Sequence, residues 1–229
     1  MNIPKHIAVI PDGNRRWATN KHLPAIMGHK KAFEETLPDL LEKAQELGIK
    51  YFTFWALSTE NLVKRSPKEV EALFTLGRNF YGKKLQELKE KGVQIRFIGN
   101  IPDLPADIQK IIKDATEETK NNTKITFIIA INYGGKDEVM RALQKVISMN
   151  YLAKSVNKEN FDQFLDTNGV PDPDLIIRTG GEKRLSGFMM WQSTYSEFYF
   201  SDLFFPDFTP EELERALEYF NDVKRNFGK

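Results

Sequence analysis

Six short apolar runs alternate along the chain with longer segments whose apolar residues recur at helical spacing. Most of the short runs are continuously apolar rather than alternating, which is typical of strands covered on both faces of a parallel sheet. The runs predict β-strands over residues 6–10, 51–57, 93–98, 124–131, 174–179 and 197–201.

The longer segments predict amphipathic helices. Segment 29–47 carries its apolar residues on one stripe and is followed by Gly48, a residue type that commonly ends helices. Segment 67–90 begins with Pro67, which favours the first turn of a helix. Helices are also predicted over residues 105–120, 137–153 and 210–224. The alternation predicts one α/β domain over residues 1–229, an open, mainly parallel six-stranded sheet flanked by helices.

Polar or glycine-rich clusters follow four of the predicted strands. The first strand is followed by PDGNRRW, the second by STEN and then Lys64 and Arg65, the fourth by NYGG, and the fifth by RTGGEKRLS. Ligands of open α/β sheets bind at the carboxyl ends of the strands. The sequence therefore predicts a binding site where these loops meet.

The first of these loops has the residue types of an anion site. Gly13 allows close approach of the backbone and Arg16 offers a forked cation, but Asp12 would repel an anion. A divalent cation between carboxylate and phosphate removes the conflict, and Mg²⁺ is the usual ion. The alternative is a structural turn with solvated arginines.

The fifth loop and two further residues extend this hypothesis. Arg178, Arg184 and Ser186 flank a glycine turn that suits a second diphosphate-sized anion, or else a surface turn. His29 is expected near the start of a helix, where it either donates to an anion or is structural. Glu197 is a second candidate metal ligand, or else a half-exposed glutamate at a strand edge.

The composition excludes several classes of protein. Lys and Arg number 33 against 32 Asp and Glu, so no overall field attracts nucleic acid or an anionic membrane. The absence of cysteine excludes disulfides and thiolate metal sites. No apolar run approaches the ~18 residues of a membrane span, so we expect a cytoplasmic protein. The 17 phenylalanines suit an apolar ligand.

Two anion sites, candidate metal carboxylates and no evident nucleophile indicate a particular chemistry. No GxxxxGK[ST] or GxGxxG motif is present, so a nucleotide-binding domain is disfavoured. Departure of diphosphate from an allylic carbon leaves a delocalised cation, and the catalyst mainly neutralises developing negative charge. Diphosphate substrates are therefore the prediction.

The blocks HIAVIPDGNRRWA, GHKKA, ALSTENL, INYGG and RTGGEKRLSGFMMWQSTYSEFYFSDLFFPDF resemble those of the cis-prenyltransferases, in family order. The DDxxD motif of trans-prenyltransferases is absent. The resemblance implies a Mg²⁺-dependent homodimer that condenses isopentenyl diphosphate onto an allylic diphosphate such as farnesyl diphosphate. Each step would form a Z double bond, giving a product such as undecaprenyl diphosphate, and the tail would thread an apolar tunnel between segment 67–90 and the sheet.

The resemblance also implies roles for individual residues. Asp12 and Glu197 would hold Mg²⁺, and Asn61, often assigned as proton acceptor, would be essential. An amide is a poor base, so we expect Asn61 to orient substrate while diphosphate takes the proton. The remaining residues implied to bind substrate are Gly13, Asn14, Arg15, Arg16, Trp17, His29, Ser58, Thr59, Glu60, Leu62, Lys64 or Arg65, Arg178, Arg184, Leu185 and Ser186.

The chain departs from the family pattern at several positions. Ala25 replaces the usual arginine before the GH histidine, so one phosphate ligand would come from elsewhere, such as Lys21 or Lys30. Leu62 replaces an aromatic residue, and the stretch after it is one residue longer than usual. Asn226 stands in the C-terminal R-x-G element, which reaches the partner subunit in this family. The alternative function is a catalytically silent homologue acting as a partner subunit.

Overall fold

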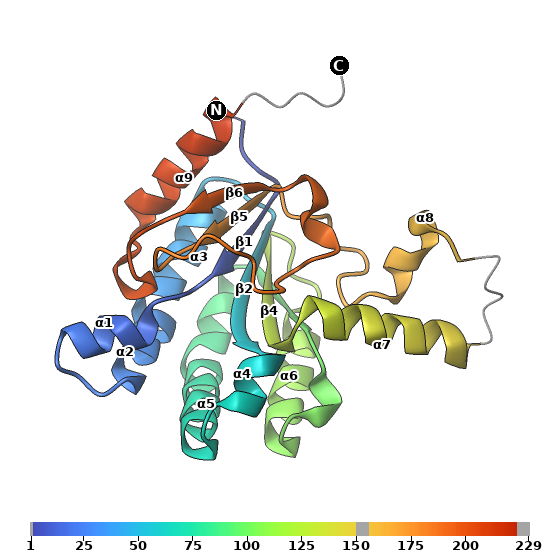
Figure 1. Cartoon of the computed structure of the whole chain (residues 1–229), viewed down its shortest axis with the longest axis horizontal. Coiled ribbons are helices and arrows are strands. Elements are labelled where there is room, and N and C mark those ends of the chain that lie inside the picture. The colour runs from blue at the N-terminus through green and yellow to red at the C-terminus, as the bar shows by residue number, and fades with distance from the viewer. Residues whose placement is uncertain (1, 150–155, 224–229) are drawn as a thin grey trace.

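The computed structural model describes residues 2–149 and 156–223 and has a single parallel sheet at its centre (Figure 1). The strand order is β3-β4-β2-β1-β5-β6, and every neighbouring pair is parallel. The strands are β1 (His6–Ile10), β2 (Tyr51–Ser58), β3 (Val93–Ile98), β4 (Ile125–Tyr133), β5 (Leu175–Arg178) and β6 (Glu197–Phe200). The predicted α/β fold with six strands is confirmed.

Helices connect the strands and cover both faces of the sheet. They are α1 (Asn14–Asn20), α2 (Ile26–Lys31), α3 (Leu37–Glu46), α4 (Thr59–Lys64), α5 (Pro67–Glu90), α6 (Ala106–Thr119), α7 (Gly135–Ser148), α8 (Lys158–Phe161) and α9 (Pro210–Asp222). A π-helical segment, Ala32–Thr36, joins α2 to α3. No helix in the described ranges is long and apolar enough to span a membrane.

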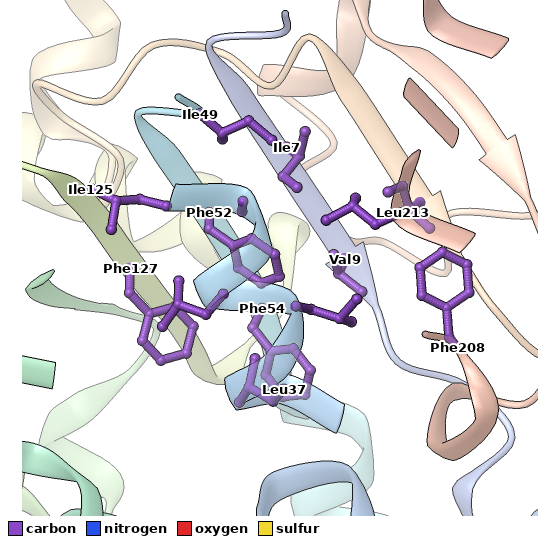
Figure 2. Packing of buried hydrophobic residues seen from close by; sticks show 14 of the residues in the cluster. Ile7, Val9, Leu37, Ile49, Phe52, Phe54, Ile125, Phe127, Phe208 and Leu213 are labelled. Atoms are coloured by element: carbon purple, nitrogen blue, oxygen red, sulfur yellow. The ribbon is translucent and has the colours of Figure 1, made fainter. Parts of the chain in front are cut away.

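Alternate residues of β1 serve the two faces of the sheet, as the pleat of a strand requires. Ile7 and Val9 pack into the larger core with α3, α5, α6 and α9. Figure 2 shows Phe54 of β2 close to Leu37 of α3, and Leu213 of α9 near β1. The opposite face is covered by the segment around Phe188 and Met189, and α7 packs against Phe164 and Leu165.

The observed helix boundaries differ from the predicted ones where a helix end is not marked by a periodic apolar stripe. The helix predicted over 29–47 begins at Ile26 and contains the π-helical segment. Helix α4 was not predicted, because its six residues are mostly polar and it depends on the Ser58 cap. Helix α7 begins at Gly135, and residues 150–153 of the predicted helix lie outside the described ranges. Helix α5 has the predicted bounds, since Ser66 and Glu69 form a capping box next to Pro67.

The first residue of β1, His6, is a buried polar group with both ring nitrogens paired. Its Nδ1 lies 2.7 Å from the Pro171 carbonyl oxygen and its Nε2 lies 2.8 Å from the Thr53 hydroxyl. Burial lowers the pKa of His6 to about 4. The imidazole is therefore neutral in the folded protein and protonates more readily when the chain unfolds.

This difference predicts a pH-dependent stability. The contribution of His6 is complete above the unfolded pKa of about 6.5 and is lost as the pH falls towards about 4. Between pH 7.5 and pH 4.5 it should remove about 2.5 kcal/mol from the free energy of unfolding. Urea titrations of the wild type and of His6→Asn should therefore converge as the pH falls. Parallel pH profiles for the two proteins would contradict the buried neutral histidine.

Candidate active site

The loops at the carboxyl ends of β1, β2 and β5 surround one polar cavity of about 630 Å³. Because these strands are parallel neighbours, their carboxyl ends meet at the same edge of the sheet. The cavity brings together most of the residues predicted from the sequence. The predicted residues that line it are Asp12, Gly13, Asn14, Arg15, Arg16, His29, Ser58, Glu60, Asn61, Arg65, Arg178 and Ser186.

Asp12 is held by a loop that other groups tie down. The Asp12 carbonyl accepts hydrogen bonds from the Phe205 main chain at 3.0 Å and from the Thr179 hydroxyl at 2.8 Å. Gly13 has φ +95°, and a Cβ there would also overlap the Phe204 ring. Only glycine fits this turn without strain. The carboxylate is therefore positioned by the backbone and faces the cavity.

Arg178, at the end of β5, is the most buried cation of the site, with 4% of its surface exposed. Its guanidinium donates to Asp12 Oδ2 at 2.8 Å and to the Ser186 hydroxyl at 2.9 Å. It also donates to the main-chain oxygen of Arg184. One rigid fork thus joins the loop after β1 to the loop after β5.

Arg16 approaches the same carboxylate from α1. Its guanidinium lies 3.2 Å from Asp12 Oδ1, which also accepts from the Gly13 main chain at 2.6 Å. Burial favours the protonated acid, but the Arg178 and Gly13 hydrogen bonds and the charges of Arg178 and Arg16 outweigh it. The pKa of Asp12 therefore lies below its ordinary value, and the carboxylate stays ionised.

Two further arginines, Arg15 and Arg65, line the cavity together with the neutral His29. His29 Nε2 is buried, and no hydrogen-bond partner for it occurs among the described residues. Burial, together with the charges of Arg65 and Arg15, lowers the pKa of His29 to about 4. Arg15 pairs with Glu69 at 3.3 Å. An anion bound here would supply the missing negative charge and a partner for the ring nitrogen.

The sequence did not decide whether Lys64 or Arg65 supplies the cation after the second strand, and the structure favours Arg65. Arg65 is partly buried and lines the cavity, whereas Lys64 is exposed and outside the lining. Lys21 and Lys30, the expected substitutes for an arginine at Ala25, are also outside the lining. Arg65 therefore supplies the cation beside His29.

Several predicted residues lie outside the lining of the polar cavity. The Trp17 indole donates to Asp207 at 2.8 Å, and Leu62 and Leu185 pack into apolar clusters. These three side chains pack behind the loops that surround the cavity. The predicted residues outside the lining are Trp17, Thr59, Leu62, Lys64, Arg184, Leu185 and Glu197.

Glu197, the second metal carboxylate that the resemblance implies, lies outside the lining of the cavity, and its part in metal binding stays a prediction. Glu197 begins β6 and pairs in register with Leu175, which in turn pairs with Ile7. Asp12 follows the opposite end of β1, roughly 10 Å or more further along the strands at ~3.3 Å per residue. The described residues contain no cluster of three metal-ligating side chains.

An apolar cavity of about 90 Å³ lies between α5, α6 and the sheet. It shares Phe33, Phe54, Ala56 and Leu57 with the polar cavity, so the two adjoin. Sequence analysis did not single out these shared residues, because they lie on the core stripes of their elements. An apolar tail attached to an anionic head fits the pair of cavities.

The fold and the site together define a class of α/β protein with a cation-lined polar cavity at the strand ends and an apolar cavity next to it. A sequence model described as "Putative undecaprenyl diphosphate synthase" matches residues 10–228. The chain belongs to this undecaprenyl diphosphate synthase family, as the sequence motifs predicted.

Relatives match over the whole chain. The chain is 42% identical to the isoprenyl transferase of Aquifex pyrophilus, covering 100% of this chain and 97% of the relative. It is 43% identical to the (2E,6E)-farnesyl-diphosphate-specific ditrans,polycis-undecaprenyl-diphosphate synthase of Micrococcus luteus, covering 99% and 92%.

Solved structures agree with these relatives. Lavandulyl diphosphate synthase from Lavandula x intermedia, solved with dimethylallyl diphosphate, matches with a TM-score of 0.94 and 34% identity over 99% of both chains. A probable undecaprenyl diphosphate synthase from Campylobacter jejuni matches with a TM-score of 0.82 and 34% identity over 100% of both chains.

Proposed function

We propose that this isoprenyl transferase condenses isopentenyl diphosphate units onto an allylic diphosphate, with farnesyl diphosphate as the primer. The product would be a Z-polyprenyl diphosphate such as undecaprenyl diphosphate. The observation that carries the proposal is the ionised Asp12 among Arg16 and Arg178, in a polar cavity that adjoins an apolar one.

The residues of the cavity divide between the two substrates. Arg15, Arg16 and His29 would bind the allylic diphosphate, and Arg65 would stand beside His29. Arg178 would hold the loop that carries Ser186 against isopentenyl diphosphate. Cations fixed before substrate binds stabilise developing negative charge without reorganisation.

The reaction breaks the allylic C–O bond, and the diphosphate leaves with the electron pair. The double bond of isopentenyl diphosphate attacks the allylic carbon, forming a C–C bond, and a proton is lost from the isopentenyl unit. Asn61 lines the cavity and would orient this substrate, because an amide is too weak a base to take the proton. The departing diphosphate is the acceptor that we propose.

The donor set fits a Mg²⁺ ion bound by one carboxylate together with substrate phosphate oxygens. Asp12 would hold the ion, since its carboxylate is ionised and faces the cavity. The ion would supply positive charge that neutralises the diphosphate.

The family resemblance also leads us to propose a homodimer. Helix α7 exposes Met140, Leu143 and Ile147 at i, i+3, i+7 spacing, an apolar face suited to a second copy. Asn226, at the position of the R-x-G element, lies outside the described residues.

The test is incubation of the purified protein with farnesyl diphosphate, labelled isopentenyl diphosphate and Mg²⁺. We expect chain extension with Z double bonds, little extension without primer, and none after chelation of the metal. A folded protein that never extends the primer would support the silent partner subunit instead. The alternative is disfavoured because Asp12, Arg16 and Arg178 remain together in this chain.

A further inference from the structure

The hairpin formed by α1, α2 and the turn between them, residues 14–31, has a charge unlike that of the rest of the chain. It contains Arg15, Arg16, Lys21, Lys30 and Lys31 but no aspartate or glutamate, a net charge of +5 against +1 for the whole chain. The remainder of the chain is therefore net acidic. Figure 1 shows the turn between α1 and α2 at the outer edge of the molecule. The excess positive charge is thus local and projects from the fold.

The lysines of this hairpin are only weakly neutralised. Lys30 and Lys31 each lie 3.9 Å from a glutamate four residues further on, which is wide for an ion pair, and exposed pairs of this kind contribute little. No ion pair of Lys21 occurs among the described residues, and its Nζ lies 4.6 Å from the centre of the Trp17 ring. The lysines are therefore available to an external anion.

The turn also exposes an apolar side chain among these cations. Residues 19–24 are all exposed, and Leu23 has 40% of its surface in contact with solvent. His22 has φ +55°, a left-handed conformation that is costly for a residue other than glycine. The Leu23 main chain donates to the Ala18 carbonyl at 2.9 Å. The turn is therefore held in one conformation that presents Leu23 to solvent.

A second exposed apolar residue lies on the same side of the fold. Val63 of α4 is 80% exposed and is followed by the exposed Lys64. Ile26 of α2 and Leu62 of α4 pack against one apolar cluster, which brings the two helices to the same side. Both helices follow the carboxyl ends of strands, at the edge that holds the polar cavity. This edge therefore presents apolar side chains beside lysines.

We propose that the α1–α2 hairpin binds the surface of an anionic lipid bilayer, with Leu23 entering the headgroup region. The phosphates of such a surface attract nearby lysines, and an apolar side chain among those lysines gains by leaving water at the interface. A nucleic acid would contact the lysines but would offer little to Leu23, so the bilayer is the favoured partner. The proposal goes beyond the proposed function, because lipid binding requires neither substrate nor turnover.

Binding through this hairpin would hold the polar cavity close to the bilayer. Arg15 and Arg16 line the cavity and lie on α1, which leads directly into the exposed turn. A ligand with an anionic head and a long apolar tail partitions into lipid. The hairpin would therefore bring the site to the phase in which such tails dissolve.

Sedimentation with lipid vesicles tests the proposal on the full chain. We expect binding to vesicles that mix phosphatidylglycerol with phosphatidylcholine, little binding to pure phosphatidylcholine, and weaker binding as the salt concentration rises. The double variant Lys21→Gln/Lys30→Gln should bind the anionic vesicles about 25-fold more weakly, which is about fivefold for each lysine. Leu23→Ser should weaken binding by about fivefold.

The chain provides a matched control for the loss of charge. Lys50 and Lys124 are exposed and directly precede β2 and β4, at the opposite edge of the sheet from the polar cavity. Lys50→Gln/Lys124→Gln removes the same charge and should change vesicle binding less than twofold. Melting temperatures close to that of the wild type would show that all the variants fold.

Several outcomes would overturn the inference. Equal losses in the two double variants would show that only net charge matters, and equal binding to neutral vesicles would exclude the anionic surface. Saturating inorganic diphosphate should leave vesicle binding in place, and its abolition would show that lipid phosphates bind in the cavity and not on the hairpin. Tighter binding to a DNA duplex, unaffected by Leu23→Ser, would identify a nucleic-acid surface instead.

Discussion

Replacing Asp12 by asparagine should reduce the turnover number of chain extension by about 10³-fold. The variant keeps the shape of the side chain but removes the negative charge that lies between Arg16 and Arg178. It also loses the Mg²⁺ ligand that we propose. The free energy of unfolding should fall by only about 1 kcal/mol, because the amide keeps one oxygen that can accept a hydrogen bond and loses the other. Steady-state kinetics and urea unfolding measure the two effects.

Asp202→Asn is the matched control for this prediction. Asp202 lies near Gly181 in the same region, is exposed, and does not line the polar cavity. The same loss of charge there should change the turnover number less than twofold. Equal losses in Asp12→Asn and Asp202→Asn would show that only the net charge of this region matters, contrary to a specific role for Asp12.

Replacing Arg178 by methionine should lower the free energy of unfolding by about 3 kcal/mol. The uncharged side chain of similar length leaves Asp12, the Ser186 hydroxyl and the Arg184 carbonyl without their common donor. Activity should fall as well, because the two loops lose the group that joins them. Urea denaturation of the full chain gives the stability change.

The control for Arg178 comes from the same loop. The Arg184 side chain is mostly exposed and pairs with Glu182, so Arg184→Met should change stability by less than about 0.5 kcal/mol. The double variant of Asp12→Asn and Arg178→Met should lose less stability than the two single losses combined, because both remove the same contact. Full additivity would contradict a direct Asp12–Arg178 interaction.

The order of strands and helices could be predicted because the apolar pattern and the capping residues of most segments indicate the same element. The strand 6–10 is continuously apolar after His6, and helix α5 begins at a proline behind a capping serine. Helix α4 was not predicted, because it is stabilised by the Ser58 hydroxyl, which caps its first turn, and not by an apolar stripe. Local signals of this kind predict elements but not their ends.

The site was predictable as a set of loops but not as a set of contacts. Parallel strands carry Asp12 and Arg178 to one edge, which the position of their motifs after the strands indicated. Glu197 lies outside the cavity lining because it begins a strand, and the register places it towards the opposite end of the strands from Asp12. The residues shared by the two cavities, such as Phe33 and Phe54, gave no signal beyond their place in apolar stripes, since a cavity is a property of tertiary packing.

The most direct test of the central claim is a crystal structure with isopentenyl diphosphate and a non-hydrolysable farnesyl thiodiphosphate. We predict one diphosphate group within hydrogen-bond distance of Arg16 and another beside Ser186, with the farnesyl tail passing Phe33 into the apolar cavity. Diphosphate groups bound away from Asp12 and Arg178, or a tail lying on the outer surface, would contradict the account.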